Sequence, residues 1–144
     1  MKGAVSFRQS GSVAPLSRLL LFVLSSLLLG TQCARLSPEE QAALAAKGYY
    51  THLAAGEYEL FLQGKAGGDS LPGDYREQLL TAYKQFMAMQ QRDHRGIREV
   101  TVSNARADTL LHYADVFLML CYGDSTQEEI VVPMVEHDGR WRMR

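Results

Sequence analysis

The feature that most constrains this chain is a change in the spacing of its apolar residues near residue 95. Before that point, apolar side chains recur every three or four residues, which is typical of amphipathic helices. After it, the segments are short, rich in β-branched residues and separated by turn residues, which is typical of strands. Helices followed by hairpin-connected strands predict an α+β fold, in which the helices cover one face of an antiparallel sheet.

Helices are expected in the first half of this domain. The first begins at Ser37, where Ser-Pro-Glu-Glu combines a capping hydroxyl, a proline at the first helical position and a glutamate three residues after the cap. It ends before Gly56, and a second short helix covers residues 57–63. A third helix covers residues 74–92 and carries one apolar stripe, which we expect to be buried.

Strands are expected in the second half, at residues 97–103, 110–122, 130–135 and 140–144. The strongest hairpin signal is the Asp138-Gly139 pair, which separates the last two strands. Pro133 predicts an edge or a bulge in the third strand, because proline cannot donate a hydrogen bond to a neighbouring strand.

The second strand is apolar on both of its faces, although a strand beneath a helical layer needs only one apolar face. Side chains alternate along a strand, so Leu118 and Leu120 share one face. If that face meets the helices, Phe117 and Met119 lie on the outside of the sheet. They would then form an interface for a homodimer or a protein partner. The alternative is that the sheet curls and covers both faces itself.

The first 32 residues predict an exported protein. Residues 1–18 are polar and basic, and residues 19–29 form an apolar stretch of eleven. A membrane-spanning helix needs about 20 apolar residues, whereas the core of a signal peptide needs only about 7–15. We therefore predict a signal peptide over residues 1–32, a tether over residues 33–36 and one domain over residues 37–144.

Removal of this leader leaves an acidic domain. The leader holds three of the 15 basic residues and none of the 16 acidic ones, so 12 bases face 16 acids and the formal charge is −4. An acidic domain matches a phosphate backbone poorly, which argues against a nucleic-acid partner. The two cysteines lie far apart and no histidine pair has ligand spacing, so we predict no metal site and no cofactor.

The end of the leader, Leu29-Gly30-Thr31-Gln32-Cys33, resembles the lipobox of bacterial lipoproteins. In that family, the cysteine thiol is joined to diacylglycerol, and cleavage makes the cysteine the new amino terminus. The family usually has Leu in place of Gly30 and a small residue in place of Gln32, so the match is incomplete. The resemblance implies a lipid anchor on Cys33. Ala34, which follows, resembles an outer-membrane address, on the side that faces the periplasm.

Two alternatives to lipidation stay open. Ordinary cleavage after Cys33 or Ala34 would give a soluble secreted or periplasmic protein. An unmodified Cys33 could pair with Cys121 in an oxidising compartment. If Cys33 is acylated, Cys121 is a lone thiol that behaves as a small hydrophobic residue.

Segments at both ends of the domain resemble the nuclear transport factor 2-like (NTF2-like) fold, also called cystatin-like. They are most similar to small lipoproteins of unknown function that use this fold in bacterial envelopes. The resemblance is carried by Tyr49-Tyr50, Leu53, Gly56-Glu57-Tyr58-Glu59, Phe61-Leu62, Tyr122-Gly123-Asp124-Ser125-Thr126, Glu129 to Val135 and Asp138 to Met143. It covers most of residues 37–144. It implies three helices packed on a curved four-stranded antiparallel sheet, in a cone that holds a pocket.

This fold hosts enzymes, binding proteins and assembly domains, so two functions are expected. The first is an envelope-anchored small lipoprotein that acts as a non-enzymatic binding or interaction module, with an unknown ligand. The alternative is a small isomerase-like or dehydratase-like enzyme. The resemblance implies an acid, a base or a tyrosine in its cone, and the candidates for the pocket are Tyr50, Tyr58, Tyr83 and His112. No catalytic motif of those enzymes is recognisable, and tyrosines more often pack as core rings with a wet hydroxyl.

Overall fold

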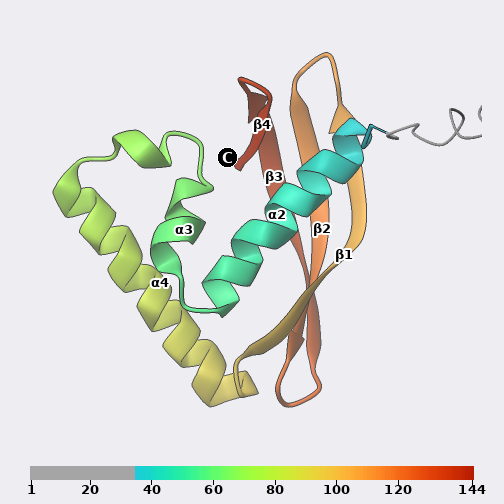
Figure 1. The fold of residues 1–144 in the computed structure, drawn as a ribbon. Helices are drawn as coiled ribbons and strands as arrows, with labels where there is room; N and C mark the ends of the chain where they lie inside the picture. Colours follow the sequence, from blue (N-terminus) through green and yellow to red (C-terminus); the bar gives the residue numbers. More distant parts are fainter. Residues whose placement is uncertain (1–34) are drawn as a thin grey trace, which may run out of the picture. The chain divides into compact units, whose positions relative to one another are not determined.

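The computed structural model describes residues 35–144, and residues 36–144 form one compact unit. The predicted signal peptide and the predicted lipidation at Cys33 lie outside the described residues. The elements in chain order are α2 (Pro38–Ala54), α3 (Tyr58–Gln63), the short 3₁₀ helix η1 (Gly68–Ser70), α4 (Gly73–His94), β1 (Ile97–Asp108), β2 (Tyr113–Tyr122), β3 (Gln127–His137) and β4 (Arg140–Met143) (Figure 1).

The strands form one antiparallel sheet in the order β1-β2-β3-β4, and each is joined to the next by a hairpin. The prediction of an α+β domain with its helices before a four-stranded antiparallel sheet is therefore confirmed. β1 extends to Asp108, five residues beyond its predicted end at residue 103. The extension keeps its pairing with β2 after a register shift between Val102 and Asn104. Pairing across the hairpin therefore outweighs the low strand preference of the asparagine, alanine and aspartate residues in this extension.

Helix α2 is positioned by its amino-terminal cap and by small side chains. The Ser37 hydroxyl accepts a hydrogen bond from the Glu40 amide at 3.2 Å, and the Glu40 carboxylate accepts one from the Ser37 amide at 2.7 Å. The pair satisfies two amides that the first helical turn leaves without partners. Ala42, Ala43 and Ala46 are buried, so this side of α2 approaches the sheet closely.

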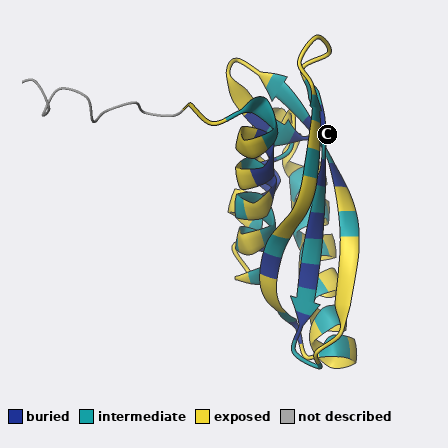
Figure 2. Ribbon diagram, turned by 90° about the vertical axis from the view of Figure 1, so that its right-hand side faces the viewer, coloured by how far each residue is buried: buried dark blue, intermediate teal, exposed yellow. Residues whose placement is uncertain are grey.

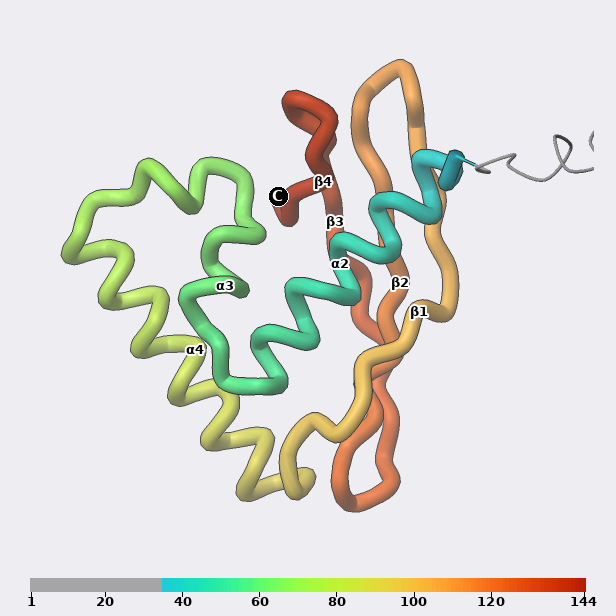
Figure 3. The backbone as a smooth tube through the Cα atoms, viewed as in Figure 1, coloured from blue at the N-terminus to red at the C-terminus, as the bar shows by residue number. Residues whose placement is uncertain are grey.

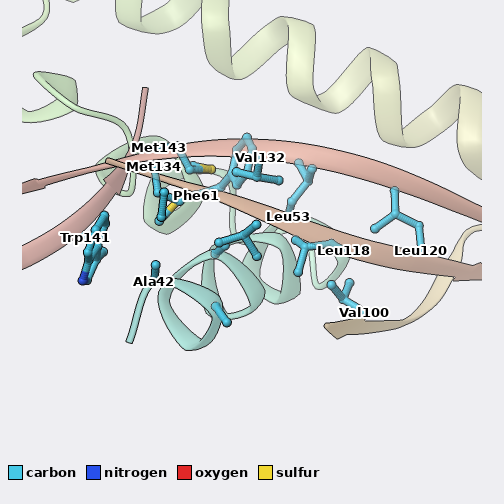
Figure 4. Packing of buried hydrophobic residues seen from close by; sticks show 14 of the residues in the cluster. Ala42, Leu53, Phe61, Val100, Leu118, Leu120, Val132, Met134, Trp141 and Met143 are labelled. Atoms are coloured by element: carbon cyan, nitrogen blue, oxygen red, sulfur yellow. The ribbon is translucent and has the colours of Figure 1, made fainter. Parts of the chain in front are cut away.

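The core lies between α2 and the inner face of the sheet (Figure 4). Every second residue of β2, from Ala114 to Tyr122, is buried, and the residues between them are half-buried, an alternation that Figure 2 shows. β3 and β4 contribute Val132, Met134, Trp141 and Met143, and the helices contribute Leu53 and Phe61. The alternation assigns Leu118 and Leu120 to the inner face, so Phe117 and Met119 lie on the outer face.

Helix α4 differs from its prediction. No residue of α4 is fully buried, and Tyr75, Phe86 and Met89 on the expected apolar stripe are exposed. The tube in Figure 3 shows the reason, because α4 runs beside α3 and reaches the sheet only near the start of β1. Only Tyr83 and Met87 pack against the core, and both are half-buried. The expectation of a buried stripe was wrong because α2 already occupies the inner face of the sheet.

Candidate functional site

Two of the candidate tyrosines meet in the helical layer. The buried ring of Phe61 lies edge-on to both Tyr50 and Tyr83, with ring centroids 5.4 Å and 4.9 Å away. Burial raises the pKa of the Tyr50 phenol, and the nearby Tyr83 phenol raises it further. Burial also raises the pKa of Tyr83. Both phenols are therefore neutral at physiological pH, and Phe61 fills the space between them.

The other two candidates lie apart from this cluster. Tyr58 begins α3 and lines a surface hollow of about 230 Å³ with Leu80 and Lys84. His112 belongs to the β1–β2 turn, because β2 begins one residue later. Its Nδ1 atom is 3.1 Å from Oε2 of Glu136, and it lines a separate hollow of about 580 Å³. The structure thus places His112 in a different hollow from Tyr58.

The outer face of the sheet is apolar at its centre. Phe117, Met119 and Cys121 lie there on β2, and each is half-buried. Val131 on β3 pairs directly with Phe117 and is 53% exposed. We call these four residues the outer-face patch. Helix α2 packs on the opposite, inner face of the sheet, where Figure 1 shows it lying across the strands.

Polar groups surround this patch. The Arg106 guanidinium lies over the Phe117 ring, 5.7 Å from its centroid. The Ser103 hydroxyl on β1 donates a 2.7 Å hydrogen bond to Oε2 of Glu129 on β3. The Glu129 backbone pairs with Met119, which lies two residues after Phe117 on β2. An apolar centre with a polar rim is typical of protein–protein interfaces. The patch is therefore the feature of the described chain that best fits a functional surface.

Sequence reasoning found half of this patch. It placed Phe117 and Met119 on the outside but did not assign a face to Val131. The pairing register of the β2–β3 hairpin would have shown it, because the tight turn after Tyr122 sets Val131 opposite Phe117. Arg106 was missed because the first strand was expected to end at residue 103.

Apart from the patch, a cluster of polar residues joins the carboxyl end of α4 to the β2–β3 turn. Hydrogen bonds from the Thr126 hydroxyl and amide hold the pKa of Asp124 at about 2, and His94 contributes a further bond at 3.0 Å. Burial raises the pKa of Tyr122 to about 12, together with the hydrogen bond that its hydroxyl donates to Glu128. These groups satisfy one another, so the cluster fastens the turn to the helix.

Two further features concern metals and membranes. Among residues 35–144, no group of three or more His, Cys, Asp or Glu side chains is arranged to hold a metal ion. Within the same range, no helix has both the length and the apolar character that crossing a bilayer requires.

Comparisons with known proteins identify a fold but no family. No family model matches the sequence, and no curated protein matches it. A solved structure of a proposed NTF2-like transpeptidase from Campylobacter jejuni is similar, with a TM-score of 0.56, 11% identity, and coverage of 68% of this chain and 92% of that chain. A SEC-C motif containing protein from Rhodopseudomonas palustris has a TM-score of 0.49 and 11% identity, with coverage of 72% and 77%. The first similarity supports an NTF2-like fold.

Proposed function

We propose that this chain is an envelope-anchored lipoprotein whose NTF2-like domain is a non-enzymatic interaction module. The domain pairs with a second copy of itself through the outer-face patch. One observation carries the proposal: the patch presents apolar side chains, including the half-exposed Val131, on the face of the sheet opposite α2. A sheet that packs on one face only normally carries polar residues on the other.

A second copy suits the patch because pairing buries the same apolar surface on both copies. Two sheets pack face to face about 10 Å apart, with the side chains of both faces interdigitating. A two-fold pair needs no second kind of surface, because the same residues contribute from each copy. Four central residues are few beside the roughly 20–30 residues per side of a standard interface, so the pairing is weak in solution. Confinement of both copies to one membrane raises their effective concentration.

The geometry favours an interaction module over the enzyme alternative. The Tyr50 and Tyr83 rings enclose Phe61, which supports a packing role for them. Cys121 lies on the outer face, whereas His94 contacts Tyr122 on the inner face, so this thiol and this imidazole do not form a nucleophile–base pair. The transpeptidase assignment of the Campylobacter protein belongs to that protein, because 11% identity supports the fold alone.

The lipid anchor is tested by the mass of the mature chain. The full chain is produced in a bacterium that processes lipoproteins, and we expect Cys33 at the amino terminus with its acyl groups attached. Cys33→Ser should abolish the acylation and release the chain from the membrane fraction. As a control, Gln32→Ser introduces the small residue that is usual at this position of the lipobox. This variant should be cleaved and acylated at least as completely as the unmodified chain. An unacylated amino terminus after Cys33 or Ala34 would show the soluble alternative instead.

The docking face is tested by light scattering on residues 34–144. Val131→Glu places a charge in the patch beside Glu129, so it should keep the protein monomeric at concentrations where the unmodified protein approaches twice the mass of one chain. Leu44→Glu on α2 is the matched control, because Leu44 is 56% exposed and Val131 is 53% exposed. It should leave pairing unchanged. A clean monomer at high concentration, or a Val131→Glu variant that still pairs, would contradict the proposal.

A further inference from the structure

The two most exposed large apolar side chains of the described chain are adjacent. Leu110 is 90% exposed and Leu111 is 73% exposed, and both lie in the turn between β1 and β2. Burial of leucine side chains is favourable, so two consecutive leucines in water are a surface that a contact with an apolar environment would stabilise. We call these two residues the leucine tip.

The leucine tip is held in place by hydrogen bonds. The Asp108 carboxylate accepts hydrogen bonds from the backbone amides of Leu110 and Leu111, both at 3.0 Å. The next residue, His112, has a left-handed backbone with φ of 49°, and its carbonyl accepts a 2.8 Å hydrogen bond from the Glu136 amide. Hydrogen bonds therefore fix the backbone conformation in which the turn exposes its two leucines.

The tip lies at the end of the domain where the preceding chain enters. Figures 1 and 2 both show the start of α2 at the same end of the sheet as the β1–β2 turn, and this turn reaches furthest in that direction. Leu36, the residue before the helix cap, is itself half exposed. Four residue steps separate Cys33 from Ser37, and at about 3.3–3.6 Å each they reach at most about 14 Å. A lipid on Cys33 would thus hold this end of the domain against the membrane.

We propose that the leucine tip inserts into the interfacial region of the membrane to which the chain is anchored. This inference rests on the proposed lipid anchor. Two carboxylates, Asp108 and Glu136, lie close to the tip, so the contact is apolar and draws nothing from acidic lipids. Two leucines cannot hold a protein on a membrane alone, but a tethered domain needs only a weak contact to fix its orientation.

The contact would set the direction of the outer-face patch. β1 and β2 run away from the tip along the length of the sheet (Figure 3). With the tip in the membrane, these strands stand upright on its surface. The patch then faces sideways, toward a neighbour anchored in the same membrane.

The test places a tryptophan at the tip. The full lipoprotein carrying Leu111→Trp is purified from membranes and reconstituted in vesicles of phosphatidylethanolamine and phosphatidylglycerol, with or without bromine in mid-chain. Bromine quenches only nearby indoles, and the signal of the unmodified protein, which comes from buried Trp141, is subtracted. The control is Phe86→Trp, an exposed site in the part of α4 that runs to the opposite end of the sheet.

We expect the tip tryptophan to lose about half of its fluorescence in brominated vesicles, as interfacial insertion implies, while the control keeps its intensity. Flotation of the same vesicles reports the anchor separately. If the chain floats with the vesicles and neither tryptophan is quenched, the tip contact is wrong and the anchor stands. Equal quenching at both sites would mean that the domain lies flat, which also overturns the inference. If the chain does not float, the anchor itself fails and this inference falls with it.

Discussion

Two valines on opposite faces of the sheet test which face is buried in the core and which is exposed. Val116 on β2 faces α2 and is fully buried, whereas Val131 on β3 faces outward and is 53% exposed. Replacing either by alanine removes the same two methyl groups and costs a similar amount of strand preference. The difference between the two variants in the free energy of unfolding therefore reports the difference in burial of the two side chains.

The magnitudes follow from the two environments. Two fully buried methyl groups represent about 1.6 kcal/mol of transfer free energy, at about 0.8 kcal/mol each. The cavity that they leave raises the expected cost of Val116→Ala to about 2–3 kcal/mol in the free energy of unfolding. At Val131, about half of the side chain is already in water, so the cost stays below about 1 kcal/mol. At about 4 °C per kcal/mol, Val116→Ala should lower Tm by about 8–12 °C.

The assay is unfolding of residues 34–144 by urea and by heat, both followed by circular dichroism, at several protein concentrations. At low concentration, the two variants should differ by the amounts above. At high concentration, the cost of Val131→Ala should rise, because pairing through the patch buries this side chain. Equal costs at low concentration would refute the assignment of the two faces. A cost at Val131 that never changes with concentration would count against pairing.

Three further predictions concern the helix cap, a close contact and a turn. Ser37→Ala should lower the free energy of unfolding by about 0.5–2 kcal/mol, measured by thermal melting, and Ser37→Asp should recover most of this loss because aspartate also caps helices. Gly64→Ala should destabilise the domain in the same assay, since an added Cβ would collide with the Tyr49 ring, which is held by its 2.9 Å hydrogen bond to a β4 carbonyl. The pKa of Asp124 lies at about 2, below the value near 3.9 of an unfolded chain, so its contribution is present above pH ~4 and is lost as the pH falls toward 2. Melting curves over that range should show a loss for the unmodified protein that Asp124→Asn lacks, and identical acid profiles would contradict this reading.

The fold was predictable wherever one local signal decided one element. The Ser-Pro-Glu-Glu sequence fixes the start of α2 because each of its residues has a separate role in capping. The Asp138-Gly139 pair forms its turn with φ values of 50° and 70°, since both residues tolerate the left-handed region. Pro133 lies near the point where β4 ends, so its missing amide does not interrupt a ladder of strand hydrogen bonds.

The site was less predictable because it depends on pairing between distant residues. Alternation within β2 separated Phe117 from Leu118, but the position of Val131 beside Phe117 depends on the hairpin register. The exposure of α4 was also beyond reach. Its apolar spacing indicates a helix with one apolar side, yet only the packed domain shows that α2 has taken the inner face of the sheet. An apolar stripe indicates which side of a helix is suited to burial, but whether that side is buried depends on which other elements cover the sheet.

The two proposals together restrict how a pair can form. Copies anchored in one membrane must be related by a two-fold axis perpendicular to that membrane. If β2 stands upright, this axis runs along the strand, and β2 of one copy packs over β2 of the other because it carries most of the patch. Cys121 then faces its counterpart. Sheets about 10 Å apart keep the two Cα atoms beyond the roughly 7 Å limit for a disulfide. A short bismaleimide should therefore cross-link the thiols in membranes where an oxidant does not, and Cys121→Ser should abolish the product. A disulfide formed readily by oxidant alone, or no bismaleimide product from chains shown to be paired, would exclude this axis.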